Sequence, residues 1–502
     1  MKPFYITTAI AYPNGDPHIG HSYEAVVTDA IARFHRLTGK EVFFQTGTDE
    51  HGQKMLRTSI ELGLTPKETA DIGSNKFRKL YDVLNISYDN FIRTTDLDHI
   101  KSAQALWRAI DLSGDIYKDV YRGWYSVKDE RYFDESETTL VESSGERISN
   151  ETGNIVEWLE EESYFFKLSK YQDQILKILE SQPSLIYPER AYNEVLAIVR
   201  SGLTDLSISR TKFNWGVPVP GDPSHVQYVW IDALANYLTG AGYPDEKFDK
   251  IWPANIHIIG KDITRFHAIY WIAFLLSANI ELPSKIVSHG FLLKNGVKAS
   301  KSLGGNDSVF DLVDRFGVDG FRYFLLKDIP LNRDSAYNDQ AILETINADL
   351  ANNIGNLVNR VLGQVHKKHY GFIPFGVWGS VDQKLWDDSL TLSKLIEDDI
   401  QNLKINEALT KISSYASETN KYVQEQAPWS ANDTRRAEIL NVICNVIKNI
   451  AILLSWATPD FSNQILKLLG VSNDRRSFAD VTELLDIENK LPDLEIAFPR
   501  VI

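Results

Sequence analysis

The chain contains almost no cysteine, and this scarcity excludes several kinds of site. Cys444 is the only cysteine among 502 residues. One thiol cannot build a disulfide framework, and it cannot supply the thiolates of a Cys-rich zinc knuckle. We therefore expect a protein of the reducing cytoplasm that holds no structural zinc.

A long apolar run and an excess of positive charge are also missing. No run of about eighteen uncharged apolar residues occurs, and the N-terminus passes directly into a strand-like stretch without the basic and apolar regions of a signal peptide. The 53 lysines and arginines are outnumbered by 68 aspartates and glutamates, for a net charge of -15. This balance excludes a polybasic protein that attracts nucleic acid by bulk charge. We expect no membrane segment and no export, and local basic patches at any nucleic-acid interface.

The sequence does contain enough apolar residues for several cores. Hydrophobic residues make up 43% of the chain and charged residues 24%, which indicates several folded domains rather than disorder. Residues 4–10 and 41–47 have short apolar strand patterns, and residues 23–37 between them have apolar side chains at helical spacing. Two short buried strands joined by a helix predict a parallel, doubly wound α/β fold of Rossmann type.

The α/β pattern is interrupted and then resumes. Residues 117–219 form short aromatic and charged segments, which indicates an inserted α+β module. Apolar strands ending in glycine return at 256–260 and 286–290, with a helical pattern over 266–277 between them. The Rossmann-type domain is therefore predicted to be split by an insertion.

The C-terminal part of the chain has only helical patterns. They cover residues 341–363, 387–424 and 437–456, and a Pro428-Trp429 pair breaks them, so we expect an all-α bundle. The predicted boundaries are 1–116 and 220–290 for the two halves of the α/β domain, 117–219 for the insertion, 291–340 for a loop and stem-contact region, and 341–502 for the bundle.

A first motif suggests chemistry on phosphate. His18-Ile19-Gly20-His21 stands where the first strand passes into the first helix. A helix N-terminus offers unpaired N–H groups and a partial positive charge to an anion, the histidines add donors, and Gly20 lets a nucleotide approach the backbone. Taken alone, the motif favours turn and cap histidines over a phosphate-binding site.

The second motif is the loop Lys298-Ala299-Ser300-Lys301-Ser302, which has glycines on both sides. Its lysines and hydroxyls can fold over a triphosphate and neutralise charge on the leaving oxygens. A solvated basic loop would have the same composition. This segment alone favours the solvated loop.

Together, in this order and at the two ends of a split α/β fold, the motifs resemble the HIGH and KMSKS motifs of class I aminoacyl-tRNA synthetases. Within that class the chain is similar to the methionyl-tRNA synthetase family, and the resemblance covers nearly its whole length. The other segments that carry it are residues 9–15 (AIAYPNG), 47–52 (GTDEHG), 228–237 (YVWIDALANY), 259–267 (IGKDITRFH) and 347–356 (NADLANNIGN).

The resemblance implies an ATP-dependent ligase of translation. In this family methionine and ATP form methionyl-adenylate and pyrophosphate, and the methionyl group then passes to the 3′-terminal adenosine of initiator and elongator tRNA(Met). This chemistry needs no protein nucleophile, because positioning and electrostatics lower the barrier. We expect Mg2+ on the phosphates of ATP and a monomeric protein. By resemblance the residues at the ATP phosphates are His18, Gly20, His21, Lys298, Ser300, Lys301 and Ser302.

The resemblance also assigns the residues that bind the other substrates. Methionine needs an apolar slot for its thioether and a carboxylate for its ammonium group, and Asp49 would supply that carboxylate. Gly260 and Asp262 would face the adenosine of ATP. The methionine-binding positions are Ala9, Ile10, Tyr12, Asp49, Trp230, Ala233, Leu234, Tyr237, Ile263 and His267. The positions that would read the CAU anticodon, by hydrogen bonds and base stacking, are Asn356, Arg360 and Trp429.

Two positions depart from the family pattern. Ala299 stands where the family usually has methionine, so a packing side chain of the lysine loop is shortened and loop closure is in doubt. Residues 125–129 lack the first cysteine of zinc-bearing relatives, in agreement with the expected absence of zinc.

Three rival functions are distinguished by other features. Cysteinyl synthetases need a thiolate-bound zinc, and the isoleucyl, valyl and leucyl enzymes carry an editing insertion that 502 residues cannot hold. A catalytically silent RNA-binding module would not need Asp49 and the histidines and lysines of the two motifs. A small nucleotidyltransferase that adenylates a metabolite would not need the long helical domain.

Overall fold

The computed structural model describes residues 2–129, 131–142, 144–294, 297–298 and 308–501. The chain forms two compact units, which we call the sheet unit and the helical unit. The sheet unit comprises Met1–Pro17, Phe43–Lys79 and Tyr88–His289, and the helical unit comprises His18–Val42, Leu80–Ser87 and Gly290–Ile502.

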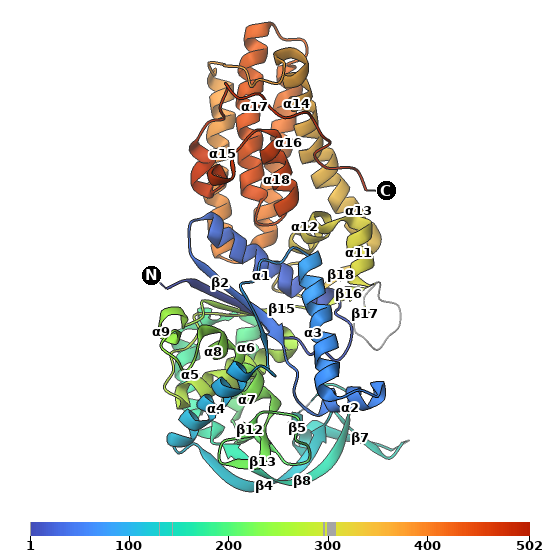
Figure 1. Ribbon diagram of the computed structural model, residues 1–502, viewed down its shortest axis with the longest axis vertical. Coiled ribbons are helices and arrows are strands. Elements are labelled where there is room, and N and C mark those ends of the chain that lie inside the picture. Colours follow the sequence, from blue (N-terminus) through green and yellow to red (C-terminus); the bar gives the residue numbers. More distant parts are fainter. Residues whose placement is uncertain (1, 130, 143, 295–296, 299–307, 502) are drawn as a thin grey trace. The chain divides into compact units, whose positions relative to one another are not determined.

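The sheet unit is built around a parallel sheet, as the sequence predicts (Figure 1). Its strands lie in the order β3-β2-β1-β14-β15-β9. The strands are β1 (Phe4–Thr8), β2 (Val42–Thr48), β3 (Asn90–Arg93), β9 (Ile186–Tyr187), β14 (Ile256–Gly260) and β15 (Ile286–His289). They are short and largely buried because helices and loops cover both faces of such a sheet.

The order of the strands reverses between β1 and β14. From β1 the chain adds β2 and β3 on one side, whereas β14 and β15 lie on the other. Ile6 pairs with Ile256 and Thr8 with Ile258 across this junction. Open parallel sheets bind ligands outside the carboxyl ends of the strands at such a reversal. Ala9, Asp49 and Lys261 directly follow the ends of β1, β2 and β14 there.

The segment between β3 and β14 contains the insertion. It has an antiparallel sheet in the order β5-β4-β8-β7-β6, with β10 paired to β8, and a small sheet β11-β13-β12. The strands are β4 (Ile116–Ser126), β5 (Arg131–Phe133), β6 (Thr138–Val141), β7 (Glu146–Ser149), β8 (Ile155–Phe166), β10 (Leu206–Ser207), β11 (Ser209–Arg210), β12 (Pro218–Val219) and β13 (Asp222–Gln227). The helices from residue 53 to residue 277 are α2 (Gln53–Leu62), α3 (Pro66–Val83), α4 (Leu97–Leu112), α5 (Gln172–Ser181), α6 (Glu189–Ser201), α7 (Val229–Leu234), α8 (Asn236–Ala241), α9 (Phe248–Ile251) and α10 (Ile272–Ser277).

Hydrogen bonds hold the turn of the insertion where zinc-bearing relatives are expected to have cysteine. Asp129 Oδ2 accepts hydrogen bonds from Ser126 Oγ at 2.7 Å and Thr152 Oγ1 at 2.8 Å, and Asn154 Nδ2 donates to Asp129 Oδ1 at 2.6 Å. The described residues include no group of three or more His, Cys, Asp or Glu that could hold a metal ion. The absence of zinc stays a prediction, and this carboxylate-centred turn is compatible with it.

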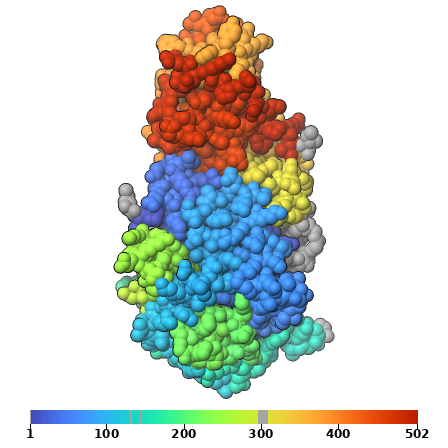
Figure 2. Space-filling model, in the orientation of Figure 1, coloured from blue at the N-terminus to red at the C-terminus, as the bar shows by residue number. Residues whose placement is uncertain are grey.

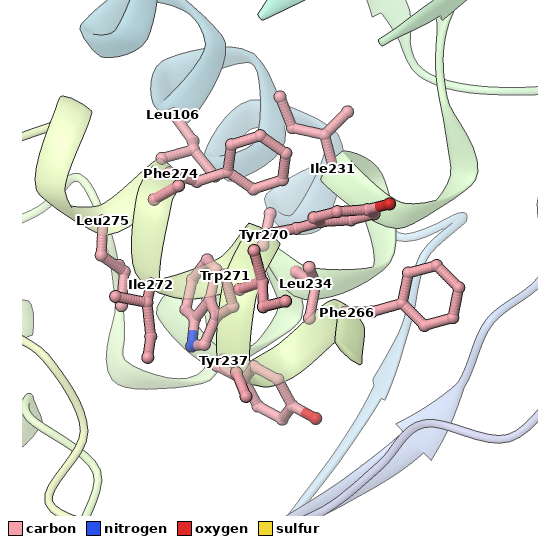
Figure 3. Close-up of a cluster of buried hydrophobic side chains, with 14 of the residues drawn as sticks. Leu106, Ile231, Leu234, Tyr237, Phe266, Tyr270, Trp271, Ile272, Phe274 and Leu275 are labelled. Carbon is pink, nitrogen blue, oxygen red and sulfur yellow. The ribbon is translucent and has the colours of Figure 1, made fainter. Parts of the chain in front are cut away.

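A large apolar cluster fills the sheet unit (Figure 3). Trp271, Phe274 and Leu234 are fully or almost fully buried in it. Tyr237 lies at the edge of the cluster in Figure 3, and its hydroxyl points away from the other side chains. Burying residues of this size contributes about 1.5–3 kcal/mol each, so the cluster provides a rigid base for the residues at its edge.

The C-terminal part of the helical unit is the predicted helical bundle (Figure 1). The last residues of the chain, darkest red in Figure 2, cover one face of it, and Asn347 holds them by hydrogen bonds to the backbone of Val501. The helices of the unit are α1 (Ile19–Leu37), α11 (Val309–Phe316), α12 (Val318–Asp328), α13 (Asp339–Thr345), α14 (Asn356–His369), α15 (Ser380–Gln401), α16 (Ile405–Gln426), α17 (Asp433–Leu454) and α18 (Pro459–Leu468). A small sheet joins β16 (Leu292–Lys294), β17 (Val297–Lys298) and β18 (Ser335–Tyr337).

Three predicted helices, over residues 387–424, 341–363 and 266–277, differ from the observed ones. The predicted helix 387–424 is two helices, α15 and α16, separated at Leu403, which has φ +61°. The predicted helix 341–363 contains a π-helical segment, Ile346–Gly355, between α13 and α14. A second π-helical segment, Phe266–Trp271, precedes α10. Apolar spacing does not reveal these segments, because each is short and continuous with an α-helix, and π-helical turns are rare.

One helix of the described chain, α17, is long and apolar enough to span a membrane when judged by length and composition. However, 89% of its apolar window is buried inside the protein. A core helix passes the same test, so packing accounts for its apolar residues.

Asp319 in α12 makes the stability of the helical unit depend on pH. Burial raises the pKa of its carboxyl group to about 6, although the N–H of Phe461 and the charge of Arg322 oppose the shift. Because the folded-state pKa lies above the unfolded value, the stabilising contribution is complete below about pH 4 and is lost as pH rises through 6. Relative to an Asp319→Asn variant, the wild-type protein is expected to lose at most about 3 kcal/mol between pH 4 and pH 8. Denaturation of both proteins across this range measures the difference, and parallel pH profiles would contradict it.

Candidate functional site

His18 and His21 form the N-terminal cap of α1. The Gly20 N–H donates to His18 Nδ1 at 3.1 Å, and the His18 N–H donates to His21 Nδ1 at 3.1 Å. The two rings stack with centroids 3.7 Å apart. A neutral imidazole whose Nδ1 accepts a hydrogen bond carries its proton on Nε2. Each ring therefore combines a capping role with an Nε2–H donor at a helix N-terminus, where an anion is favoured.

Gly20 is required by the position of the His18 ring. A Cβ atom at residue 20 would lie 2.9 Å from His18 Cε1 and 3.0 Å from His18 Nδ1. Any larger residue would push the ring away from its capping position. The sequence predicts glycine here because it lets a nucleotide approach the backbone. The structure adds a second reason for glycine, which is the space that the His18 ring needs.

The lysine motif lies largely outside the described residues. This applies to Ala299, Ser300, Lys301 and Ser302. Lys298 belongs to β17, whose backbone pairs with β16 through Leu293 and Lys298.

The residues predicted to bind methionine all belong to the sheet unit. Ala9, Ile10 and Tyr12 follow β1, and Asp49 follows β2. Trp230, Ala233 and Leu234 come from α7 and Tyr237 comes from α8. Ile263 lies in the 3₁₀ turn after β14, and His267 lies in the π-helical segment Phe266–Trp271. Trp230 and Tyr237 are seven residues apart in the sequence, but they lie on separate helices, because α7 and α8 meet at Ala235.

A hydrogen bond joins the two most buried polar residues of this set. Tyr237 Oη lies 2.7 Å from His267 Nε2, and His267 Nδ1 lies 3.0 Å from the carbonyl oxygen of Ile263. A carbonyl only accepts, so Nδ1 carries the proton and the tyrosine hydroxyl donates to Nε2. Burial lowers the pKa of His267 to about 4, so the ring is neutral at pH 7. The pair thus presents a fixed, uncharged aromatic wall.

Trp230 forms a second aromatic surface. Its indole stacks on Phe266 with ring centroids 3.8 Å apart and planes 5° from parallel, and it meets His267 edge to face at 6.2 Å. Trp230 is only partly buried. An apolar, polarizable surface that is partly accessible can receive a thioether.

Asp49, which follows β2, is hydrogen-bonded to the loop that follows β1. It is buried, and its N–H donates to the carbonyl oxygen of Ala11 at 2.9 Å. Tyr12 Oη donates to the carbonyl oxygen of His51 at 3.2 Å. The loops after β1 and β2 are therefore tied together, which fixes Asp49 beside Tyr12.

A buried charge network beneath these loops was not predicted. Asp232 accepts hydrogen bonds from His51 Nδ1 and His99 Nε2, each at 2.7 Å. Burial alone would raise the pKa of Asp232, but the two histidines lower it to about 2, so the carboxylate stays ionised. Asp232 lies two residues after Trp230 in α7, and His51 lies two residues after Asp49. The network therefore links the helix that carries Trp230 to the loop that carries Asp49.

Gly260 and Asp262 lie at the carboxyl end of β14. Gly260 is the last residue of the strand and pairs with His289 of β15. Asp262 follows in a single 3₁₀ turn, Lys261–Ile263, and is exposed. This is the edge of the sheet at which open α/β folds bind ligands.

The three residues predicted to read an anticodon belong to the bundle. Asn356 is the first residue of α14 and is exposed, and Arg360 lies one turn further on the same face. The Arg360 guanidinium lies 5.9 Å from the ring centroid of Trp429, which occupies the turn between α16 and α17 and is 42% exposed. The structure brings Arg360 and Trp429 together, as base recognition by both would require.

Two family models match the chain. The model described as tRNA synthetases class I (M) matches residues 4–362. The model described as the anticodon binding domain of methionyl tRNA ligase matches residues 373–496.

Curated proteins and solved structures agree with the family models. The methionine–tRNA ligase of Rhizobium meliloti (strain 1021) is 49% identical over 511 residues, and that of Brucella suis biovar 1 (strain 1330) is 46% identical over 508 residues. Both alignments cover 100% of this chain and 98% of the relative. The structure of Mycobacterium tuberculosis methionyl-tRNA synthetase in complex with methionyl-adenylate has a TM-score of 0.97 at 47% identity, with 100% of both chains covered.

Proposed function

The chain belongs to the methionyl-tRNA synthetase family of class I tRNA synthetases, and from this premise we propose how its residues ligate methionine to tRNA. The reaction is ATP-dependent and proceeds in two steps. A methionine carboxylate oxygen attacks the α-phosphorus of ATP and pyrophosphate leaves. A hydroxyl of the 3′-terminal adenosine of tRNA then attacks the methionyl carbonyl carbon, and AMP leaves.

His18, Gly20 and His21 serve the phosphates of ATP in this proposal. The Nε2–H groups and the positive end of α1 stabilise negative charge as pyrophosphate departs. Lys298, Ser300, Lys301 and Ser302 complete this role by resemblance, and Gly260 and Asp262 bind the adenosine. The support is the paired capping of His18 and His21, which fixes the tautomer of both rings.

Mg2+ accompanies ATP in this proposal. The described residues offer no cluster of three or more carboxylates, histidines or cysteines to enclose a metal ion. This fits Mg2+, which retains water and binds substrate phosphates in such enzymes. When bound, it offsets charge on the phosphate oxygens.

Methionine binds against the aromatic wall of the sheet unit. Asp49 pairs with the ammonium group, and Trp230 and Tyr237 enclose the thioether together with Ala9, Ile10, Tyr12, Ala233, Leu234, Ile263 and His267. The observation that carries this assignment is the hydrogen bond from Tyr237 to neutral His267. It holds both rings in place and leaves no charge beside an apolar substrate.

Tyr237→Phe is expected to raise the KM for methionine about five- to thirtyfold. The substitution leaves His267 Nε2 buried without its donor, at a cost of about 1–2 kcal/mol. Methionine-dependent exchange of labelled pyrophosphate into ATP measures the effect, with cysteine, leucine and isoleucine as substrate controls. The KM for ATP should not change. An unchanged KM for methionine would remove Tyr237 from the binding site. Absence of exchange in the folded wild-type protein would favour a silent RNA-binding function.

The bundle binds the anticodon of tRNA(Met) in this proposal. Asn356 and Arg360 hydrogen-bond base edges, and Trp429 stacks on an unpaired base. Trp429→Ala is expected to weaken binding of an anticodon stem-loop RNA with a CAU triplet about five- to a hundredfold, without an effect on pyrophosphate exchange. Binding titrations measure this, with the exposed Leu395→Ala in α15 as a control. Equal affinities of Trp429→Ala and wild type would contradict the assignment.

The remaining assignments extend the proposal. We place catalytic halves at 1–116 and 220–290, the insertion at 117–219, the lysine-loop region at 291–340 and the anticodon-binding domain at 341–502. We also propose that the protein is a cytoplasmic monomer and that it serves both initiator and elongator tRNA.

A further inference from the structure

The segment after α14 exposes aromatic side chains at one end of the bundle. Tyr370 is 83% exposed and Phe375 is 71% exposed. The last turn of α14 directly before them contains His366, Lys367, Lys368 and His369. Basic residues beside exposed aromatic rings are the composition of a surface that binds single-stranded nucleic acid. In a chain with a net charge of -15, such a local basic patch is where an RNA contact is expected.

Tyr370 adopts a backbone conformation that its side chain disfavours. It caps α14 with φ +54° and ψ +25°, in the left-handed region, and its N–H donates to the carbonyl oxygen of Val365. Glycine is the common residue at this position of a helix end, because it has no Cβ to clash. Because the ring of Tyr370 is exposed, its packing offsets little of the free-energy cost of this backbone conformation. A strained residue whose side chain lies mostly in water suggests a functional use of that side chain.

The cations of this surface are Lys367 and Lys368. Both are exposed, and they follow Arg360 by about two turns of α14. Burial and the charge of Arg436 lower the pKa of His369, so this histidine is neutral at pH 7. Two flexible ammonium groups next to an aromatic ring can neutralise the phosphates on either side of a stacked base.

The tyrosine lies at the same end of the bundle as Trp429. Arg436 of α17 donates from Nε to the carbonyl oxygen of Pro428 at 2.9 Å, and its charge acts on His369, the neighbour of Tyr370. Trp378 Nε1, in the segment after Tyr370, donates to Asn441 Oδ1 of α17 at 2.9 Å. The segment after Tyr370 therefore packs against α17, the helix that follows the turn carrying Trp429.

We propose that Tyr370 stacks on an unpaired base of the tRNA anticodon loop outside the CAU triplet, while Lys367 and Lys368 bind the adjacent phosphates. This inference rests on the proposed binding of the anticodon by Trp429 and extends it along the loop. Stacking on a phenol ring tolerates any base, so the contact adds affinity without adding sequence specificity.

Tyr370→Gly separates the backbone from the side chain. Glycine relieves the left-handed strain, so the melting temperature should not fall. Affinity for a CAU anticodon stem-loop RNA should nevertheless fall about five- to a hundredfold, and Tyr370→Phe should retain affinity within about twofold. Lys367→Gln should reduce the slope of log affinity against log salt by about one. Asn279→Gly is the matched control, because Asn279 has the same φ of +54° but lies in the sheet unit.

The results distinguish this inference from the proposed function. An equal loss for a CAU stem-loop and for one with a scrambled triplet supports it, whereas a loss confined to CAU places Tyr370 in triplet reading and overturns it. If Tyr370→Gly keeps its RNA affinity while Trp429→Ala loses affinity, the inference about Tyr370 is overturned and the proposed anticodon site stands. The surface around Tyr370 would then fit a protein partner instead. Unchanged affinity in both variants overturns the proposed anticodon site as well.

Discussion

Replacing Arg322 with methionine is expected to lower the free energy of unfolding by about 3–5 kcal/mol. Arg322 is fully buried, and its Nη2 lies 2.7 Å from Oδ2 of the fully buried Asp29. The same guanidinium donates to the carbonyl oxygens of Ala457 and Leu84, both at 3.0 Å. One substitution therefore removes one of the donors to a buried carboxylate and a donor to each of two buried carbonyl groups.

The state of Asp29 explains the size of this effect. Burial by itself would raise its pKa, but the charges of Arg322 and Arg33 and the hydrogen bonds from Ser87 lower it below its usual value. Asp29 is therefore ionised at neutral pH, and removing Arg322 leaves a buried charge with only part of its partners.

A matched substitution tests the explanation. Arg315→Met removes a guanidinium that lies 2.8 Å from Asp339 with both side chains exposed to water, and exposed pairs are worth about 0–1 kcal/mol. Chemical denaturation followed by circular dichroism measures both variants. An Asp29→Leu, Arg322→Met double variant should regain part of the loss, because it removes the unpaired charge. Equal losses in Arg315→Met and Arg322→Met would show that burial of the pair does not matter.

The sequence predicts the framework of both units because local patterns determine it. Residues 4–10, 41–47, 256–260 and 286–290 are each apolar and short, and each contains a strand of the parallel sheet. The predicted and observed strands differ most at their ends. The strand predicted over residues 4–10 stops at Thr8, although the N–H of Ala9 still donates to the carbonyl oxygen of Ile258.

Features that depend on distant residues escape such prediction. The turn at Leu403 contains no glycine or proline, and the leucine keeps its positive φ because its side chain is buried. The carboxylate of Asp232 gains its histidines from residues 51 and 99, which no local pattern relates to it. A buried aspartate in an otherwise apolar helix was the available signal, since such a group requires partners.

The sequence predicts the candidate site residues only in part. Chemistry alone left His18 and His21 open between helix caps and phosphate donors, and the structure shows that they cap α1. The two roles are compatible, because capping uses Nδ1 of each ring and leaves the proton on Nε2. Only a substitution that preserves the cap can measure the other role.

His18→Asn is such a substitution, and it is expected to lower kcat for pyrophosphate exchange about a hundred- to a thousandfold. Asparagine is among the best N-cap residues, and its side-chain oxygen can replace Nδ1 as the acceptor at the start of α1. It has no group at the position of Nε2, so a donor to the departing phosphate is lost while the helix is retained. The KM for methionine should change little, because the residues proposed to bind methionine belong to the sheet unit.

His21→Gln completes the argument. Glutamine at the third helical position reaches back to the N-cap N–H as the second half of a capping box, so it keeps the bond that His21 Nδ1 makes with His18. Both variants should melt within a few degrees of the wild type, and both should be slow in exchange. A variant that exchanges pyrophosphate at nearly the wild-type rate would assign its histidine to capping alone. A large fall in melting temperature would show instead that the imidazole rings, which stack 3.7 Å apart, hold α1 in a way that an amide cannot replace.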